Sequence, residues 1–147
     1  MNDIPKLINL ISNATNSNLK SVTFSWPYAK NKDNSSNNTT LNNVLNILRY
    51  SGYIRGFYFS IKSSSNKTHN IKHQICIDLK YDQHGKSVIN WIKLISTPSL
   101  AKYVTTKTLW QLRSNPGLSV ISTSIGILTD TEARRYNVGG YLLFIIR

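Results

Sequence analysis

Residues 120–135 of this chain read VISTSIGILTDTEARR and combine three consecutive hydroxyl side chains, a glycine and a helix start. The hydroxyls at 122–124 stand between two apolar runs of the kind found in β-strands, so they are predicted to lie at a turn. Thr129 and Glu132 have the spacing of a capping box, in which each residue satisfies a backbone N–H of the other. The stretch therefore predicts two strands joined by a polar turn and followed at once by a short helix.

The three hydroxyl side chains of Ser122, Thr123 and Ser124 allow two interpretations. Small donors and acceptors fixed at a turn can form a rigid polar surface that contacts sugar and phosphate oxygens. Alternatively, a turn rich in serine and threonine only hydrogen-bonds to its own backbone. The local sequence leaves both interpretations open, so the choice depends on the rest of the chain.

The charge of the chain favours a polyanionic partner. Its 147 residues include 18 lysines and arginines against 6 acids, which gives a formal net charge of +12. Such an imbalance opposes compaction by self-repulsion unless a partner neutralises it. The basic residues are spread from Lys6 to Arg147 rather than gathered in a tail, which favours a folded protein lying along its partner. Nucleic acid is the first candidate partner, and an anionic membrane surface or an acidic protein is the second.

Hydrophobic periodicity predicts helices and strands along the whole chain. Asp3 and Pro5 start a first helix that runs to about residue 14. A second helix is predicted from Thr40, as its N-cap, to Gly52, where a left-handed stop belongs. Short helices are expected at 107–113 and 132–136, and strands at 21–26, 53–61, 71–81, 88–95, 100–105, 118–123, 127–128 and 141–146.

The order of these elements predicts an α+β chain of two small lobes. An N-terminal α-β-α-β-β lobe covers residues 1–83, and a β-rich C-terminal lobe with short helices covers residues 87–147. The segment near 82–87 is polar and contains a glycine, so it is the expected linker. Polar loops are expected at 30–40 and 62–70. In the strand at 53–61, the odd-numbered residues are predicted to share one face.

Little in the chain resembles a catalytic or metal site. Cys76 is the only cysteine, so neither an internal disulfide nor a multi-cysteine metal site is expected. The three histidines, at 69, 73 and 84, lack acids placed to complete a ligand set. Gly139 and Gly140 precede a strand in isolation and are expected to permit tight backbone approach rather than cofactor binding. We therefore expect no catalytic residue, no metal, no cofactor and no small-molecule substrate.

Membrane insertion is not expected either, because no apolar run approaches the length needed to span a bilayer. The first 20 residues contain two lysines, no arginine and an acid, which is unlike a transit peptide.

Nucleic-acid binding finds more support in the sequence. Arg134 and Arg135 follow the predicted helix start beside the hydroxyl cluster. Serine, threonine and backbone donors can contact 2′-hydroxyls across the shallow minor groove of A-form RNA, where shape is read more than base sequence. Five aromatic residues offer stacking surfaces for unpaired bases, with a core role as the alternative for each: Trp26, Tyr28, Trp91, Tyr103 and Trp110.

From end to end, the order of features resembles the bacterial-type family of small-subunit ribosomal protein eight. The resemblance rests above all on Ser122-Thr123-Ser124-x-Gly126 with Thr129-Asp130 and Ala133-Arg134, and on Gly139-Gly140 before an apolar ending. Weaker matches are Val44-Leu45 with Gly52-Tyr53-Ile54, Leu79-Lys80-Tyr81, and Ile95-Ser96-Thr97-Pro98 with Tyr103. The C-terminal part of the match is specific, whereas the N-terminal part is mostly a pattern of elements.

The resemblance implies a two-lobed protein that binds the central domain of small-subunit ribosomal RNA and supports subunit assembly and translation. Neighbouring small-subunit proteins would be its other partners. Carried over by position, Ser122, Thr123 and Ser124 would contact an irregular RNA helix, Gly126, Gly139 and Gly140 would let the backbone approach closely, and Tyr103 would lie on the same face of the C-terminal lobe. With Arg134 and Arg135 these residues form the expected RNA-binding site.

The chain departs from the family pattern at four positions. Ile125 stands where the family usually has lysine, Tyr141 where it has glutamate, Ser99 where it has glycine, and Ala101 where it has a basic residue. These departures concern the detailed RNA contacts rather than the fold.

Composition bears on where the protein works. Asparagine, isoleucine, lysine, tyrosine and serine are abundant, alanine is scarce, and Glu132 is the only glutamate. A strongly AT-biased genome encodes such a composition, as in many organelles. We therefore expect a ribosomal protein of the mitochondrion, encoded in the organelle, with a plastid or a bacterial cytoplasm as alternatives. The alternative function is that of a basic surface-binding protein attached to a membrane or to an acidic protein.

Overall fold

The structure is a computed structural model that describes residues 3–27, 35–63, 71–97, 100–112 and 117–147. The helices are α1 (Asp3–Asn16), α2 (Ser35–Tyr50), α3 (Thr106–Leu112) and α4 (Asp130–Arg135). The strands are β1 (Ser21–Pro27), β2 (Ile54–Ser63), β3 (Ile71–Leu79), β4 (Ile92–Leu94), β5 (Tyr103–Val104), β6 (Leu118–Thr123), β7 (Gly126–Thr129) and β8 (Gly140–Ile146). The predicted α+β class is confirmed.

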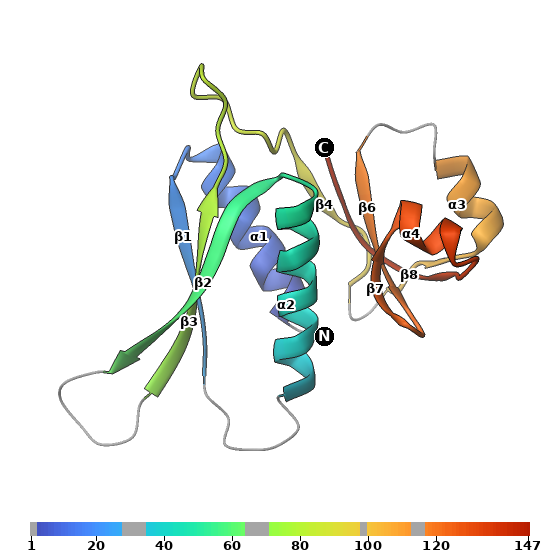
Figure 1. The fold of residues 1–147 in the computed structure, drawn as a ribbon, viewed down its shortest axis with the longest axis horizontal. Coiled ribbons are helices and arrows are strands. Elements are labelled where there is room, and N and C mark those ends of the chain that lie inside the picture. Colours follow the sequence, from blue (N-terminus) through green and yellow to red (C-terminus); the bar gives the residue numbers. More distant parts are fainter. Residues whose placement is uncertain (1–2, 28–34, 64–70, 98–99, 113–116) are drawn as a thin grey trace.

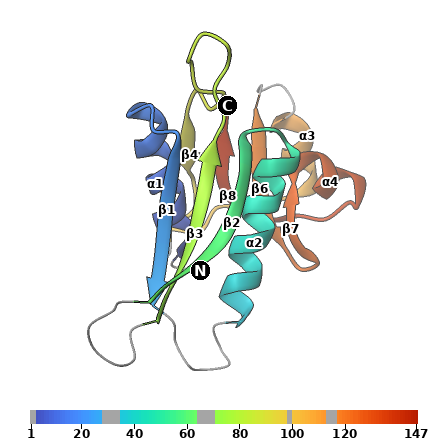
Figure 2. The ribbon, with the colours of Figure 1, turned by 60° about the vertical axis from the view of Figure 1, so that its left-hand side comes forward.

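The strands form two antiparallel sheets. The first sheet has the order β1-β3-β2, and the second has the order β4-β8-β6-β7, with β5 also paired to β8. Helices α1 and α2 lie on the side of the first sheet that faces the second sheet (Figure 1). Helices α3 and α4 lie together at the outer side of the second sheet, as the rotated view also shows (Figure 2). The β6–β7 turn projects beyond the sheet at one end.

The periodicity of α1 matches its burial. Its apolar stripe of Ile4, Leu7, Ile8, Ile11 and Ala14 is buried, with exposed fractions of at most 3 %. The predicted stripe of α2 is buried to the same degree and consists of Leu41, Val44, Leu45 and Leu48. Both helices are therefore held mainly by packing of one face, because isolated helices of this length are marginal in water.

Helix α2 begins six residues earlier than the sequence predicted. The expected N-cap was Thr40, but the helix starts at Ser35, so part of the expected polar loop is helical. Once packing of the apolar stripe has nucleated a helix, each further residue adds a backbone hydrogen bond at small cost. Serine, asparagine and threonine lower that gain without abolishing it, and composition alone misplaced the boundary.

The prediction that odd-numbered residues of the β2 strand share one face holds from Phe57 onward and is wrong before it. Between Ile54 and Gly56 the pairing with β3 shifts register, so that Ile54 lies opposite Leu79 and Gly56 opposite Asp78. An extra residue of this kind is a β-bulge, and it inverts the alternation on one side of it. Ile54 is consequently buried at 2 % exposure, while Arg55 is exposed.

The segment expected to link two lobes is a hydrogen-bonded turn. The Asp82 carboxylate accepts hydrogen bonds from the backbone N–H groups of His84 and Lys86, and Tyr81 forms an isolated bridge with Ser87. The first sheet precedes this turn and the second follows it. One core cluster nevertheless contains residues from both sides, including Leu45 and Phe144. The exact lobe boundary at 82–87 stays a prediction.

Three strand predictions were too long. Of the strand expected at 88–95, only 92–94 pairs as β4, because the N–H groups of Asn90 and Trp91 both turn to the carbonyl oxygen of Arg147. Of the strand expected at 100–105, only 103–104 pairs as β5, and of that at 71–81, 71–79 pairs as β3.

Among the described residues, no helix has the length and apolar character to cross a bilayer.

Candidate RNA-binding surface

The hydroxyl cluster lies at the β6–β7 turn, as predicted. Thr123 ends β6 and pairs with Gly126, which begins β7, so that Ser124 and Ile125 form the tip. Gly126 has φ +133°, a backbone conformation that residues with a Cβ rarely adopt, although the space around it is open. Glycine is therefore needed here for the shape of the turn rather than for lack of room.

The three hydroxyls have different roles at this turn. Thr123 donates its hydroxyl to the carbonyl oxygen of Gly126 at 2.7 Å and so closes the turn on itself. Within the described residues, the hydroxyls of Ser122 and Ser124 make no hydrogen bond, and Ser124 is exposed. The interpretation of a turn that hydrogen-bonds to its own backbone therefore holds for the middle hydroxyl, and a contact role for its two neighbours stays a prediction.

A row of residues across three strands extends this surface. Ser122 on β6 lies opposite Tyr141 on β8, and Tyr141 lies opposite Tyr103 on β5. Directly opposite residues point to the same face of a sheet. The two tyrosine rings pack edge to face, with centroids 5.4 Å apart, and stay 58 % (Tyr103) and 46 % (Tyr141) exposed. The sequence did not predict Tyr141 as a site residue, because its place beside Ser122 follows from the pairing of β8 with β6.

Glycine is needed at positions 139 and 140 because other strands of the chain approach the backbone there too closely for a side chain. A Cβ on Gly140 would lie 2.2 Å from the carbonyl oxygen of Ser122, and a Cβ on Gly139 would lie 2.7 Å from that of Val104. The tight backbone approach expected from the sequence is therefore present, with β5 and β6 as the approaching strands. These glycines bring the tyrosine row and the hydroxyl turn together, and an RNA role for them would be indirect.

Helix α4 starts with the capping box that the sequence predicted. Thr129 donates its backbone N–H to the Glu132 carboxylate at 2.9 Å, and the Glu132 N–H donates to the Thr129 hydroxyl at 3.3 Å. The methyl group of Ala133 is fully buried beneath the helix. Because α4 begins where β7 ends, the helix lies at the opposite end of this strand from the hydroxyl turn.

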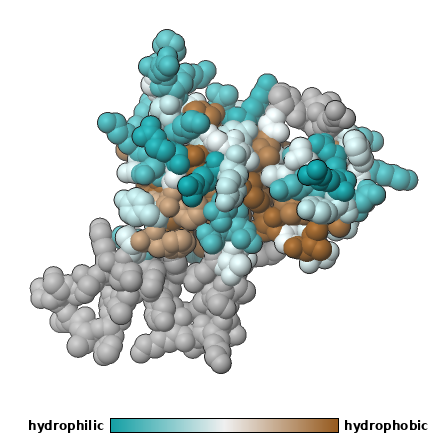
Figure 3. Space-filling view, in the orientation of Figure 1, coloured by the Kyte–Doolittle hydropathy of each residue, from teal (hydrophilic) through white to brown (hydrophobic). Residues whose placement is uncertain are grey.

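The two arginines of α4 are not brought to the hydroxyl turn, and they differ from each other. The Arg134 guanidinium is held by Asp130 at 3.1 Å and by the carbonyl oxygen of Leu109 at 3.2 Å, and its side chain is only 11 % exposed. It also lies 5.7 Å from the centre of the Trp110 ring. Arg135 is exposed. In the space-filling view, hydrophilic side chains gather over α4, and hydrophobic ones lie over the neighbouring β6–β7 turn (Figure 3).

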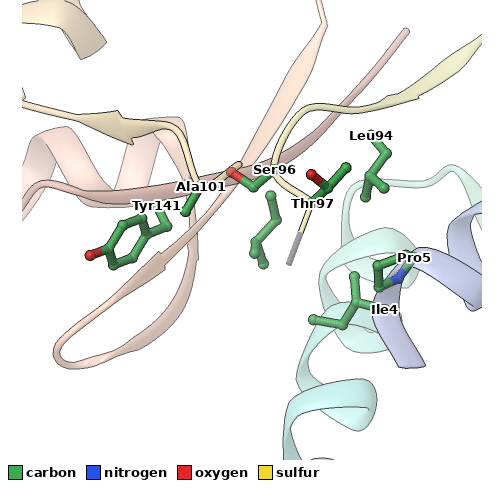
Figure 4. A pocket seen from close by; sticks show the side chains of 8 residues that line it. Ile4, Pro5, Leu94, Ser96, Thr97, Ala101 and Tyr141 are labelled. Carbon is green, nitrogen blue, oxygen red and sulfur yellow. The ribbon is translucent and has the colours of Figure 1, made fainter. Parts of the chain in front are cut away.

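An apolar groove adjoins the tyrosine row. It has a volume of about 200 Å³ and runs between the start of α1, at Ile4 and Pro5, and the β8 residues Tyr141 and Leu143. Leu94, Ser96, Thr97 and Ala101 complete its lining. Figure 4 shows Tyr141 and Ala101 on one side of this groove and Ile4 and Pro5 on the other.

The remaining sequence candidates are scattered. Trp91 and Trp110 are 44 % and 55 % exposed, whereas the side chain of Trp26, together with Tyr28, lies outside the described residues.

In the part of the chain that the structure describes, no three histidine, cysteine or acidic side chains gather as metal ligands would. Cys76 is buried, with its Sγ 3.7 Å from the Ser60 hydroxyl.

Comparison with known proteins gives one consistent family. The family model described as ribosomal protein S8 matches residues 2–146. The small ribosomal subunit protein uS8 of Nitrobacter hamburgensis is 42 % identical over 104 residues, which cover 71 % of this chain and 74 % of the relative. The uS8 protein of Bartonella bacilliformis is 44 % identical over 100 residues, covering 68 % and 70 %. That of Rhodopseudomonas palustris is 38 % identical over 118 residues, covering 80 % and 84 %.

Proposed function

The chain belongs to the ribosomal protein S8 family, and we propose that it binds the central domain of small-subunit ribosomal RNA as a structural protein of the small ribosomal subunit. The resemblance seen in the sequence is thereby confirmed at the level of the family. The RNA target and the contacting residues remain our proposal, for which the geometry of the C-terminal sheet provides the support.

The observation that carries this proposal is the polar turn itself. Ser122 near the end of β6 and Ser124 at the hairpin tip offer hydroxyls that nothing in the described chain occupies, and Thr123 and Gly126 fix the shape of this turn. A preformed row of small donors and acceptors suits the shallow minor groove of A-form RNA, where 2′-hydroxyls and base edges are displayed. Such groups lose little conformational freedom on binding, so few contacts are needed for useful affinity.

The neighbouring side chains fit the same partner. Tyr103 and Tyr141 expose aromatic surface in one row with Ser122, and aromatic rings stack on unpaired bases of any sequence. The net charge of +12 supplies the sequence-independent attraction to phosphates. We assign sugar contacts to Ser122 and Ser124, stacking to Tyr103 and Tyr141, and a phosphate contact to Arg135. Thr123, Gly126, Gly139, Gly140 and Arg134 then shape and position the surface.

We further propose that the chain catalyses no reaction and takes neighbouring small-subunit proteins as its other partners. The alternative of a basic surface-binding protein, attached to a membrane or to an acidic protein, finds no support in the family. The amino-acid composition, rich in asparagine, isoleucine and lysine, supports a location in the mitochondrial ribosome. The relatives named above are bacterial, which supports the alternative of a bacterial ribosome. Detection of the protein in ribosomes of fractionated cells would decide between these locations.

Binding to a transcript of the central domain tests the proposal. The purified chain should bind this transcript tightly and a scrambled RNA of equal length weakly, and the affinity should fall steeply with salt because several phosphates are neutralised. Vesicles of anionic lipid serve as the control for non-specific basic character. Equal affinity for transcript, scrambled RNA and vesicles would contradict the proposal.

A further inference from the structure

We propose that the hollow between α3 and α4, edged by Trp110 and Arg135, binds one unstacked nucleotide of the ribosomal RNA. This inference rests on the proposed function and adds to it a second contact, separate from the hydroxyl turn. The base would stack on the exposed face of Trp110, and its phosphate would meet Arg135.

The hollow has the size and the lining that a nucleotide needs. It is open, has a volume of about 670 Å³ and is lined by Trp110, Thr131, Glu132, Arg134 and Arg135. Sites for small ligands usually enclose about 300–1,000 Å³. Trp110 is 55 % exposed on α3, so part of its indole ring is accessible to a partner.

The Trp110 ring is held in place by the arginine beside it. The Arg134 guanidinium lies 5.7 Å from the ring centre and is itself fixed by Asp130 and by the carbonyl oxygen of Leu109. A cation at this distance attracts the face of an indole ring. Because Arg134 supports the ring, the ordering cost of stacking a base on Trp110 is largely met before binding.

The charges around the hollow favour an anionic ligand. Of the two acids of α4, Asp130 pairs with Arg134, and Glu132, which also lines the hollow, accepts two hydrogen bonds from Thr129 on one carboxylate oxygen. Arg135 is exposed and makes no ion pair among the described residues. Lys107 is also exposed and lies three residues before Trp110, so it shares that face of α3. An aromatic face beside unpaired cations is the combination that binds single-stranded nucleic acid.

One RNA can reach both contact sites. The hydroxyl turn and α4 are separated by the four residues of β7 (Gly126–Thr129), which span roughly 10–13 Å at about 3.4 Å per residue. This distance is short enough for one RNA to contact both the turn and α4, and an irregular RNA helix can offer a flipped-out nucleotide to the hollow beside α4. A regular duplex has no free base to offer there.

The fluorescence of Trp110 reads out this contact directly. In a Trp26→Phe, Trp91→Phe double variant, Trp110 is the only tryptophan, and titration with the central-domain transcript should quench its emission along the same curve as binding. A uridine dodecamer, which has no double helix, should quench the same emission at higher concentration. Emission that stays constant while the transcript binds would overturn the inference.

Affinity measurements provide the second readout. In the unsubstituted background, Trp110→Ala should raise the Kd for the transcript about 5- to 100-fold, whereas Trp110→Phe should largely restore binding because it keeps an aromatic face. Trp91→Ala, at a similarly exposed tryptophan that directly precedes β4, at the opposite edge of the second sheet from β7, is the matched control and should leave the Kd within twofold. Circular dichroism checks that each variant is folded.

The possible results separate this inference from the proposed function. Unchanged Kd for Trp110→Ala with normal binding by the unsubstituted chain would overturn the nucleotide site and leave the RNA function intact. A loss equal to that of Trp91→Ala would overturn it as well. Failure of the unsubstituted chain to bind the transcript would overturn the proposed function and this site together.

Discussion

Ser122 on β6 lies directly opposite Tyr141 on β8, and this pair joins the hydroxyl turn to the exposed tyrosine rings of the same face. The contact surface is thus built from strands that are far apart in sequence. It depends on the close packing of β8 against β6, which Gly140 permits.

The exposed ring of Tyr141 should contribute to RNA affinity. We expect Tyr141→Ala to weaken binding of the central-domain transcript by about 1–3 kcal/mol, the usual loss when a stacked base loses its aromatic partner. Tyr50→Ala is the control, because Tyr50 is also well exposed, at 85 %, but lies at the end of α2 in the N-terminal half. Equal effects of the two substitutions on the Kd would argue against the tyrosine row.

A methyl group on Gly140 should destabilise the fold. The added Cβ would lie 2.2 Å from the carbonyl oxygen of Ser122, so β8 must move away from β6. We expect Gly140→Ala to lower the free energy of unfolding by about 1–3 kcal/mol, as overpacking does. Gly56→Ala is the matched control within a strand, since nothing lies within 4 Å of its Cβ position, and denaturant unfolding compares the two. Similar stabilities of both variants would show that this close approach is not rigid.

The capping box at α4 should be measurable in the same assay. Thr129→Ala removes the acceptor for the Glu132 N–H, and we expect it to cost about 1 kcal/mol of unfolding free energy. Glu132→Gln keeps an acceptor that can reach the Thr129 N–H, so its cost should be clearly smaller. If Glu132→Gln costs as much as Thr129→Ala, the carboxylate has a role beyond the cap.

The raised pKa of Tyr53 predicts that the free energy of unfolding falls as the pH rises in the alkaline range. Burial, and secondarily the negative charge of Asp130, raises the pKa of Tyr53 above its ordinary value of 10.0. The folded state therefore holds this proton more tightly than the unfolded state, and the resulting stabilisation is present below pH 10 and is lost as pH rises through the folded pKa. Tyr53→Phe should flatten the fall of unfolding free energy above pH 10. Tyr50→Phe, at a side chain 85 % exposed, should not.

Much of the fold could be predicted because local patterns decide it. The apolar stripes of α1 and α2, the buried residues Ile75, Ile77 and Leu79 of β3, and the capping box at Thr129 follow from residue spacing alone. The apolar runs on either side of the hydroxyl cluster also predicted β6 and β7 as two separate strands. These features depend on residues within one turn of helix or one strand, where sequence and structure are directly linked.

The rest depended on tertiary contacts that no local pattern records. The bulge at β2 is set by the register with β3, which puts Ile54 opposite Leu79. The carbonyl oxygen that leaves no room for a side chain at Gly140 belongs to Ser122, 18 positions earlier in the chain. Arg134 was expected to face RNA, yet its guanidinium is occupied by Asp130 and lies over Trp110. The four-residue spacing of Asp130 and Arg134 on one helix was a signal for the ion pair, but nothing in the sequence pointed to Trp110.

The affinity of Ser124→Ala for the central-domain transcript, at fixed salt, tests most directly whether the hydroxyl turn holds RNA. We predict a loss of about 1–3 kcal/mol, because an RNA group buried against the turn would lose its hydrogen-bond partner. Ser51→Ala, at an exposed serine of the N-terminal half, should bind as the unsubstituted chain does. A Ser124→Ala chain that binds with unchanged Kd would contradict the assignment of this turn to the RNA-binding surface.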